Sequence, residues 1–569
     1  MYLNNVNPYS VAKQHGRDKL HISERVKLLF DKDSFIELYP AEVKKTNDDT
    51  EKNITDNTSG GDTEKNIAEN TSGDNTEKNI TDNTSGDDTE KNITENISGD
   101  NDSISGYLDE NIIDNSIEDA VSGYDGVITG YGNINGQRVY FYGQDFTCMG
   151  GTFGYWHSKQ IIAIIKEAIR NRRPVIGIYD GGGARIQEGA ASVAGCGELF
   201  GVNTLASGYI PQISIIAGTC AGGAVYSPGL TDFVFTIDGI SNMFVTGAKV
   251  INEVQGTDYL IEELGGARIH SEKSGVAHFL MKDERSCYEQ VRKLIDILPP
   301  CYMEERIYRV AAYHEKDISD IHDILPKDNW DEYDVIPVIN EILDDDSFIE
   351  VHKEFAKNIV VGFGMLGGIT VGVVASQTLY ENGSVDMDSA DKAARFVEYC
   401  DCYNIPIITL VDSTGFVMTA EQEHNGLIRH GAKMIHAYAN ATTIRLTVIL
   451  RKAYGGPYIL YGCKQLGADR HYVWPNAEVA VMKAEGAVAV ISHSQLGKLE
   501  GIEKSEFLRQ QLESYKEQYM NSRMVLDRHF VDEEIKPEDT REVLYKDLIR
   551  LSGKPIEVKV KKKHGNMPV

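Results

Sequence analysis

The feature that most constrains this fold is an internal duplication. The stretch LLFDKDSFIELY at residues 28–39 is echoed by EILDDDSFIEVH at residues 341–352, and DGVITGYGNINGQRVYFYGQDFT by NIVVGFGMLGGITVGVVASQTLY. Further along, RRPVIGIYDGGGARIQEG corresponds to NIPIITLVDSTGFVMTAE, and ISIIAGTCAGGAVYSP to LTVILRKAYGGPYILY. Asp180 and Gly222 lie 42 residues apart, and Asp412 and Gly455 lie 43 apart. The sequence therefore predicts two copies of one domain in tandem.

One acidic segment interrupts the first copy. The motif TEKNI recurs there with a period of 13 residues, at Thr50, Thr63, Thr76 and Thr89. Residues 46–118 hold 20 acidic residues and 4 lysines, so this segment carries much of the net charge of −29. It has too few apolar residues to offset the entropy cost of ordering, which predicts a disordered insertion without a function of its own. A tether for a partner is the alternative.

Bulk properties limit the class of protein. A chain of 569 residues exceeds one ordinary core, and 41% hydrophobic content is typical of globular proteins. We expect a cytoplasmic protein, because no apolar run could span a membrane and the N-terminus has no signal or transit pattern. The acidic balance argues against a nucleic-acid partner. The eight cysteines lack metal-ligand spacing, so we expect reduced, mostly buried thiols and no metal.

Each copy alternates short apolar strands with stretches of helical period. Helices are expected around SKQIIAIIKEAIRNRR and ADKAARFVEYCDCYN. This alternation predicts an α/β fold with a largely buried sheet. The expected strands are 175–179, 212–217, 407–411 and 446–450. The predicted organisation is a helical lead-in at 1–45, the acidic repeats at 46–118, a first domain at 119–315 and a second at 316–569.

Four glycine-rich turns follow four of these strands. They are YDGGGAR at 179–185, GTCAGGAVYSP at 218–228, VDSTGF at 411–416 and AYGGPY at 453–458. Unpaired N–H groups at such turns bind anions, including those that develop during a reaction. No P-loop, no GxGxxG followed by an acidic residue and no Gly-x-Ser-x-Gly elbow is present. Surface or capping roles are expected for the nearby Glu188, Asp412 and His424.

Several long motifs occur in the order of one known family. They are GGGARIQEGAASVAGCGELF, PQISIIAGTCAGGAVYSPGLTDFVF, MFVTGAKV, EELGGARIHSEKSGVAHF, NGLIRHGAKMIHAYANAT, RKAYGG, WPNAEVAVM and the C-terminal KKKHGNMPV. The sequence closely resembles the carboxyltransferase family of biotin-dependent acyl-CoA carboxylases and decarboxylases, of the propionyl-CoA carboxylase β-subunit type. The resemblance covers nearly everything except residues 41–118.

The resemblance implies two tandem crotonase-like (ββα-spiral) domains, the first binding an acyl-CoA and the second binding biotin carried on a partner protein. It also implies two oxyanion holes of backbone N–H groups, one for the thioester enolate and one for the biotin ureido oxygen. The chain has no ATP-grasp segment, so a separate biotin carboxylase and a biotin carrier protein are the expected partners. Family members commonly assemble as homo-oligomers, often hexamers.

The site residues follow from matching motifs. The resemblance places the first hole at Gly183 and Ala184 together with Gly223 and Ala224. The duplication then places the second hole at the residues Gly415, Phe416, Gly455, Gly456 and Pro457. Gly415, Gly456 and Pro457 would contact biotin. Most family members have alanine where Pro457 stands, and proline has no N–H to donate.

Further positions bear on the substrate. Lys159 and Arg185 are candidates for contact with CoA phosphates, although solvated helix charges are an equal alternative. Ile459 stands where propionyl-CoA carboxylases often have aspartate, and an aliphatic residue there is common in acetyl-CoA carboxylases and decarboxylase subunits. The family's VPGFLPGTAQE reads STGFVMTAEQE here. Lys483 is not expected to carry biotin, because Ala484 replaces the second Met of the Met-Lys-Met site.

Three functions remain open on this basis. The first is a carboxyltransferase subunit acting on propionyl-CoA or acetyl-CoA. The second is the α-subunit of a sodium-translocating, biotin-dependent decarboxylase of the methylmalonyl-CoA type, with membrane subunits as partners. The third is a scaffold paralogue whose biotin hole is disabled.

Overall fold

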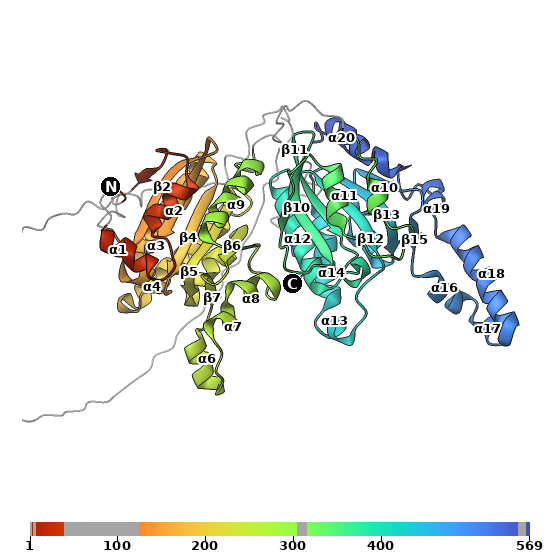
Figure 1. Ribbon diagram of the computed structural model, residues 1–569, viewed down its shortest axis with the longest axis horizontal. Coiled ribbons are helices and arrows are strands. Elements are labelled where there is room, and N and C mark those ends of the chain that lie inside the picture. The colour runs from red at the N-terminus through yellow and green to blue at the C-terminus, as the bar shows by residue number, and fades with distance from the viewer. Residues whose placement is uncertain (1–2, 4–6, 39–123, 304–315, 556–564, 569) are drawn as a thin grey trace, which may run out of the picture. The chain divides into compact units, whose positions relative to one another are not determined.

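The computed structural model describes residues 3, 7–38, 124–303, 316–555 and 565–568, and the predicted acidic repeats lie outside these ranges. Within them, each half contains one eight-stranded sheet (Figure 1). The first sheet has the order β1-β2-β3-β4-β5-β6-β8, with β7 paired to β5. The second has the same order of counterparts, β9-β10-β11-β12-β13-β14-β16, with β15 paired to β13. The predicted duplication is confirmed.

The strands of the first sheet are β1 (Ile36–Leu38), β2 (Val127–Ile134), β3 (Gln137–Gln144), β4 (Val175–Gly181), β5 (Gln212–Ala221), β6 (Phe233–Ile237), β7 (Asn242–Phe244) and β8 (Phe279–Met281). Those of the second are β9 (Ile349–Val351), β10 (Ile359–Leu366), β11 (Ile369–Ser376), β12 (Ile407–Ser413), β13 (Arg445–Tyr454), β14 (Arg470–Val473), β15 (Glu478–Ala480) and β16 (Glu533–Glu534). The four predicted strands are all present. Each is longer than predicted, because the buried chain continues past its apolar run into polar residues.

Helices cover both faces of the first sheet. Since successive strand residues point to opposite faces, alternate side chains enter two separate cores. One core joins strand residues such as Phe141 and Ile176 to α2 (Ile22–Leu29) and α9 (Glu284–Ile297). The other joins residues such as Tyr142 to α3 (Tyr155–Asn171) and α4 (Ala190–Ala206). This sandwich is the predicted α/β arrangement.

The second sheet is covered in the same way. On one face α11 (Val335–Ile342) and α20 (Thr540–Arg550) pack against strand residues that include Val373. On the other, α12 (Met387–Cys402) and α14 (Leu427–Asn440) pack near Val374. The two helices expected from sequence periodicity are α3 and α12, each beginning three residues earlier than its apolar pattern.

The remaining helices complete the fold. In the first half they are α1 (Pro8–His15), α5 (Tyr226–Gly229), α6 (Ala248–Gln255), α7 (Ile261–Gly265) and α8 (Ala267–Glu272). In the second they are α10 (Ile321–Ile324), α13 (Ala420–His424), α15 (Gly456–Leu460), α16 (Ala484–Ile491), α17 (His493–Leu496), α18 (Gly501–Tyr519) and α19 (Ser522–Asp527). Six of the eight cysteines are buried, and none forms a disulfide. Within the described ranges, no helix combines the length and apolar content that a membrane crossing requires.

The two halves match residue by residue at the strand ends that carry the glycine-rich turns. Tyr179 on β4 pairs with Ile216 on β5, and Val411 on β12 pairs with Ile449 on β13. In both sheets the register then shifts at the same place, before the last pair of residues. This match fixes the counterparts used below: Ala184 with Phe416, Gly223 with Gly456, and Ala224 with Pro457.

Candidate active site

The turn after β4 and the turn after β12 present one N–H group each in the same way. Phe153 forms a bridge with Ala184: its N–H donates to the Gly183 carbonyl at 2.8 Å, and its carbonyl accepts from the Arg185 N–H at 2.8 Å. Because successive groups in an extended chain point to opposite sides, the Ala184 N–H points away from this bridge. Val385 makes the same two bonds around Phe416, at 2.9 Å each. Ala184 and Phe416 are therefore placed as equivalent donors.

The turns after β5 and β13 provide the start of a helix. Gly222 and Gly455 have φ of 64° and 61°, a conformation that glycine adopts without a Cβ clash. Gly222 begins a short 3₁₀ helix (Gly222–Val225), and α15 follows Gly455. The first N–H groups of a helix have no partner within it and lie at its positive end. Gly456 opens α15 and offers such a group.

The two turns meet in each half, but with different side chains. In the first half, a Cβ on Gly183 would lie 2.6 Å from the Ala221 carbonyl oxygen, so the two turns are in contact. In the second half, a Cβ on Gly456 would lie 2.2 Å from the Phe416 ring. The phenyl ring thus packs directly on Gly456, where the first half has only the methyl group of Ala184. The backbone N–H groups of the strand-end and helix-start turns are of the kind that binds an oxyanion.

Pro457 occupies the helical turn at the second site. It is buried and lies in the first turn of α15, where proline is well tolerated. Its first-half counterpart, Ala224, is also buried. The fold therefore accommodates the proline without distortion of the helix, at the cost of one N–H donor. Phe416 and Gly456 remain as possible donors on this side.

Two apolar cavities flank the turns of the second half. One of about 920 Å³ is lined by Gly455, Gly456 and Ile459 and by residues of α16, α18 and α19. Another, of about 590 Å³, is lined by Phe416, Leu460 and residues of α13 and α14. Ile459 is 45% exposed and faces the larger cavity. An aliphatic side chain therefore contributes to the wall beside the second pair of turns.

The charged candidates of the first half already have protein partners. Lys159 lies on α3 and forms an ion pair with Glu198. The Arg185 guanidinium is almost fully buried, and Nη1 contacts Asp125 at 2.6 Å and Glu188 at 2.7 Å. Despite its burial, these two carboxylates raise the pKa of Arg185. A CoA phosphate would have to compete with these contacts, so both phosphate contacts stay predictions.

The three polar residues expected to have surface or capping roles differ in their surroundings. The Glu188 carboxylate accepts the Tyr155 N–H at the start of α3, at 2.6 Å, and so caps that helix. His424 is exposed at the end of α13. The expectation for Asp412 is wrong, because this residue is fully buried and paired with Arg451 and Lys452. Arg451 and Lys452 follow the apolar run of β13, and two adjacent cations in a buried strand are a sequence signal of buried pairing.

Lys483 has a structural contact of its own. Its ammonium group lies 3.6 Å from the centroid of the Trp330 ring, at the start of α16. A cation over an indole face at this distance is a favourable interaction.

Comparison with known proteins identifies the family. The carboxyl transferase domain model matches residues 108–567. The chain belongs to the carboxyl transferase family. It is 45% identical, over 78% of its length and 86% of the relative's, to a propionyl-CoA carboxylase carboxyltransferase subunit of Haloferax mediterranei. It is 41% identical, with the same coverage, to the methylmalonyl-CoA decarboxylase subunit alpha of Veillonella parvula.

A solved structure agrees with this family. The transcarboxylase 12S hexamer, with methylmalonyl-coenzyme A and methylmalonic acid bound, matches 99% of this chain and 95% of its own at 35% identity, with a TM-score of 0.82. The predicted fold of two tandem crotonase-like domains is confirmed, and so is the resemblance to β-type carboxyltransferase subunits. The chain is a biotin-dependent carboxyltransferase of the acyl-CoA carboxylase class.

Proposed function

We propose that this chain is the subunit that moves a carboxyl group between carboxybiotin on a separate carrier protein and the α-carbon of a short acyl-CoA. The observation that carries the proposal is the duplicated pair of turns, which gives each half one strand-end donor and one helix-start donor. Dividing the chain into an acyl-CoA domain (119–315) and a biotin domain (316–569) is part of the proposal.

In the first half, the N–H groups of Ala184 and Ala224 would hold the thioester oxygen. They are positioned by Gly183 and Gly223, and they stabilise the negative charge that develops when the α-proton is removed. No side-chain base is needed from this half. Lys159 and Arg185 would lie on the side of the CoA phosphates.

In the second half, the N–H groups of Phe416 and Gly456 would hold the ureido oxygen of biotin. Gly415 and Gly455 allow the two turns to form, and Pro457 would contact the biotin ring without donating a hydrogen bond. Carboxybiotin, when bound, supplies carbon dioxide and the base for the α-proton. The residues of this half stabilise the negative charge on the ureido oxygen, and Gly456 supplies the helix-start donor because Pro457, the counterpart of Ala224, has no N–H.

Two acyl groups fit the proposal, propionyl and acetyl. Ile459 replaces a charged residue with an aliphatic one beside the larger cavity, which favours an apolar contact there. The 41% identity to a methylmalonyl-CoA decarboxylase subunit also supports a second function, in which the chain takes the carboxyl group off the acyl-CoA. Membrane decarboxylase subunits would then replace the biotin carboxylase as partners.

Assembly into a homo-oligomer, as a hexamer, is also part of the proposal. Two surfaces expose large apolar side chains: α6 and α7 in the first half, and α16 to α18 in the second. The 19-residue helix α18 has no buried residue. Exposed apolar surface of this extent is typical of interaction sites. The solution mass of the full chain, measured by light scattering, tests the hexamer.

The decisive experiment is an acyl-CoA panel with the wild-type chain, run with carboxybiotin as the carboxyl donor in one direction and with free biotin as the carboxyl acceptor in the other. Carboxylation of propionyl-CoA or acetyl-CoA would support the first function. Decarboxylation of methylmalonyl-CoA without appreciable carboxylation would support the second. If the folded protein turns over none of these substrates, both are refuted and the scaffold paralogue stands.

A further inference from the structure

Each strand-end turn begins at a buried aspartate, and the two aspartates are counterparts. Asp180 on β4 and Asp412 on β12 have no exposed surface and precede Gly183 and Gly415 by three residues. The backbone N–H of Asp180 donates to Gln144 Oε1 at 2.9 Å. That of Asp412 donates to Ser376, the counterpart of Gln144, at 3.1 Å. The neighbouring strand thus fixes the backbone at both sites.

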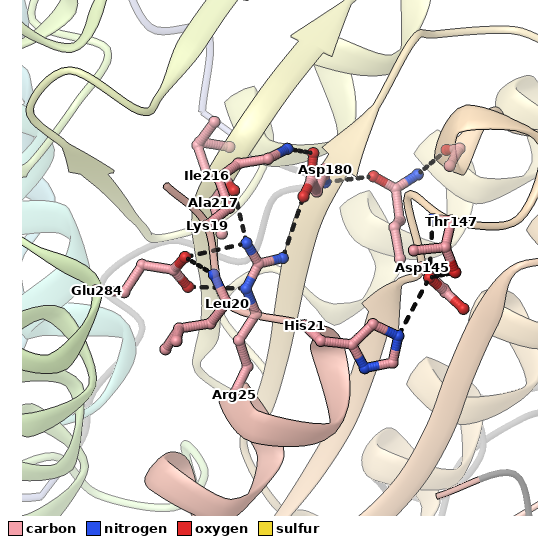
Figure 2. Close-up of polar contacts among 12 residues, drawn as sticks. Lys19, Leu20, His21, Arg25, Asp145, Thr147, Asp180, Ile216, Ala217 and Glu284 are labelled. Carbon is pink, nitrogen blue, oxygen red and sulfur yellow. Dashed lines mark hydrogen bonds and ion pairs between the residues drawn. The ribbon is translucent and has the colours of Figure 1, made fainter. Parts of the chain in front are cut away.

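In the first half, the cations that pair with this aspartate come from the N-terminal segment. Lys19 Nζ lies 2.6 Å from Asp180 Oδ1, and Arg25 Nη1 lies 3.2 Å from Oδ2 (Figure 2). Arg25 also donates to Glu284 on α9, at 2.7 Å from Nε, and to the Ala217 carbonyl at 2.8 Å. Although burial opposes it, the neighbouring Tyr288, Glu284 and Asp180 raise the pKa of Arg25. The four charges form a neutral buried cluster.

In the second half, the cations come from the adjacent strand itself. Arg451 Nε lies 2.6 Å from Asp412 Oδ2, and Lys452 Nζ lies 3.0 Å from Oδ1. Arg451 donates as well to the carbonyls of Asp328 and Asp331, at 3.2 and 2.9 Å. Burial lowers the pKa of Lys452, opposed by the charge of Asp412.

At matching positions of the two halves, the arginine that contacts the aspartate has changed from the helix to the strand. The first-half counterpart of Arg451 is Gly218, where a Cβ would lie 2.1 Å from Asp180 Oδ1 and 2.8 Å from Lys19 Nζ. The second-half counterpart of Arg25 is Val338, which is fully buried in the apolar core of α11. Arginine on the helix and glycine on the strand in one half thus become valine and arginine in the other. Both halves place a guanidinium group against the aspartate by different routes.

Removing one partner of such a buried pair leaves an uncompensated charge, so each cluster strongly resists movement of its strand end. We propose that Lys19 and Arg25, through Asp180, and Arg451 and Lys452, through Asp412, are positioning residues that each hold one strand-end donor, and thereby one substrate side. This rests on the proposed function. Loss of Arg25 should therefore impair use of the acyl-CoA, and loss of Arg451 use of biotin.

The chain offers a matched pair of controls. Arg292 donates to the Leu29 carbonyl and to Asp31, each at 2.7 Å. Arg541 donates to the Ile342 carbonyl and Asp344, the counterparts of those acceptors, each at 2.6 Å. Both arginines connect a helix end to an aspartate, and these bonds involve neither glycine-rich turn. Their loss reports the general cost of removing an Arg–Asp pair.

The test compares the full-length variants Arg25→Met, Arg451→Met, Arg292→Met and Arg541→Met. For each, carboxyl transfer from a carboxylated acyl-CoA to free biotin is followed, and KM is measured for the acyl-CoA at saturating biotin and for biotin at saturating acyl-CoA. Arg25→Met should raise KM for acyl-CoA about tenfold or more and leave KM for biotin within about twofold, since a lost hydrogen bond to the bound thioester costs about a factor of ten in affinity. Arg451→Met should show the reverse. The controls should lower the unfolding temperature and leave both KM values within about twofold.

If Arg25→Met or Arg451→Met does not fold, Lys19→Met or Lys452→Met provides the same readout with one contact removed. Equal changes in both KM values, or changes no larger than in the controls, would overturn the proposal. The wild type separates the two claims: no turnover refutes the proposed function, whereas an active wild type with variants lacking the KM split refutes only the positioning role.

Discussion

In the first half, cations from the N-terminal segment hold the turn after β4, whereas in the second half cations on β13 hold the matching turn after β12. The backbone register and the two hydrogen bonds of the strand-end bridge are the same in both halves. After duplication, the backbone geometry of the turns was thus retained while the side chains supporting it were exchanged. What is kept in both copies is the placement of the strand-end N–H group.

The halves differ more at the donors themselves. The first has small residues, Ala184 and Ala224, at the two donor positions, while the second has Phe416 and Pro457. The phenyl ring covers Gly456, and the proline removes one N–H. The first half is therefore the more regular oxyanion site, and the comparison can be tested from both sides.

The largest effect is expected on removing the buried carboxylates. Asp412→Asn leaves Arg451 and Lys452 without their carboxylate, and should cost about 3 to 5 kcal/mol of unfolding free energy. Asp180→Asn should cost less, because Arg25 keeps its bonds to Glu284. Hydrogen exchange at the backbone amides of β4 and β12 reports the loss of protection in each half separately. A larger loss of protection in β4 of Asp180→Asn than in β12 of Asp412→Asn would contradict the cluster comparison.

A smaller effect is expected from adding one methyl group at the helix starts. Gly456→Ala places a Cβ against the Phe416 ring and should cost about 1 to 3 kcal/mol, the usual penalty for overpacking. Gly223→Ala is the matched control, because no atom lies within 4 Å of a Cβ there. Thermal unfolding measures both. The double variant Gly456→Ala/Phe416→Ala should recover part of the loss; no recovery would show that the ring is not the cause.

A pH effect should distinguish α12 from α3. Lys392 is buried on α12, where α3 has Gln160, and burial lowers its pKa to about 7. Its ammonium group donates to the carbonyls of His352, Phe355, Ala356 and Ile359. Above pH 7 the folded lysine loses its proton while the unfolded lysine keeps it, so rising pH stabilises the fold until the unfolded lysine also titrates.

One group contributes at most about 1.4 kcal/mol per pH unit to this slope. Lys392→Gln, which copies the first half, should remove it between pH 7 and 9, as measured by urea unfolding at several pH values. Lys357→Gln changes an exposed lysine nearby and should leave the slope unchanged. An unchanged slope in Lys392→Gln would show that this lysine stays protonated in the fold.

Much of this architecture follows from the sequence, because the duplication fixes which residues correspond. The predicted strands and helices are present, and the four glycine-rich turns lie where the repeat placed them. The charge clusters were not predicted, because their partners are far apart in sequence: Lys19 and Asp180 are separated by 161 positions. Repeat matching also cannot find a pair that is exchanged between copies, since Arg25 and Gly218 correspond to Val338 and Arg451.

The packing of Phe416 on Gly456 was beyond sequence reasoning for a related reason. The motif match gives each residue a position in its turn but says nothing of how a side chain crosses to the other turn. The burial of Asp412 does not follow from its own motif, because it depends on Arg451 and Lys452 on the next strand. Periodicity reports local structure, while these contacts depend on tertiary packing.

The central claim is that the biotin side lacks, at Pro457, the helix-turn N–H that its counterpart Ala224 gives the acyl-CoA side. The most direct test is the kcat of Pro457→Ala for carboxyl transfer from a carboxylated acyl-CoA to free biotin, compared with the wild type and with the mirror variant Ala224→Pro. Restoring an N–H should raise kcat at least about fivefold. The gain should stay below the hundredfold or more that a well-aligned oxyanion donor contributes to kcat. Ala224→Pro should lower turnover. An unchanged kcat in Pro457→Ala, with the protein folded and active, would contradict the claim.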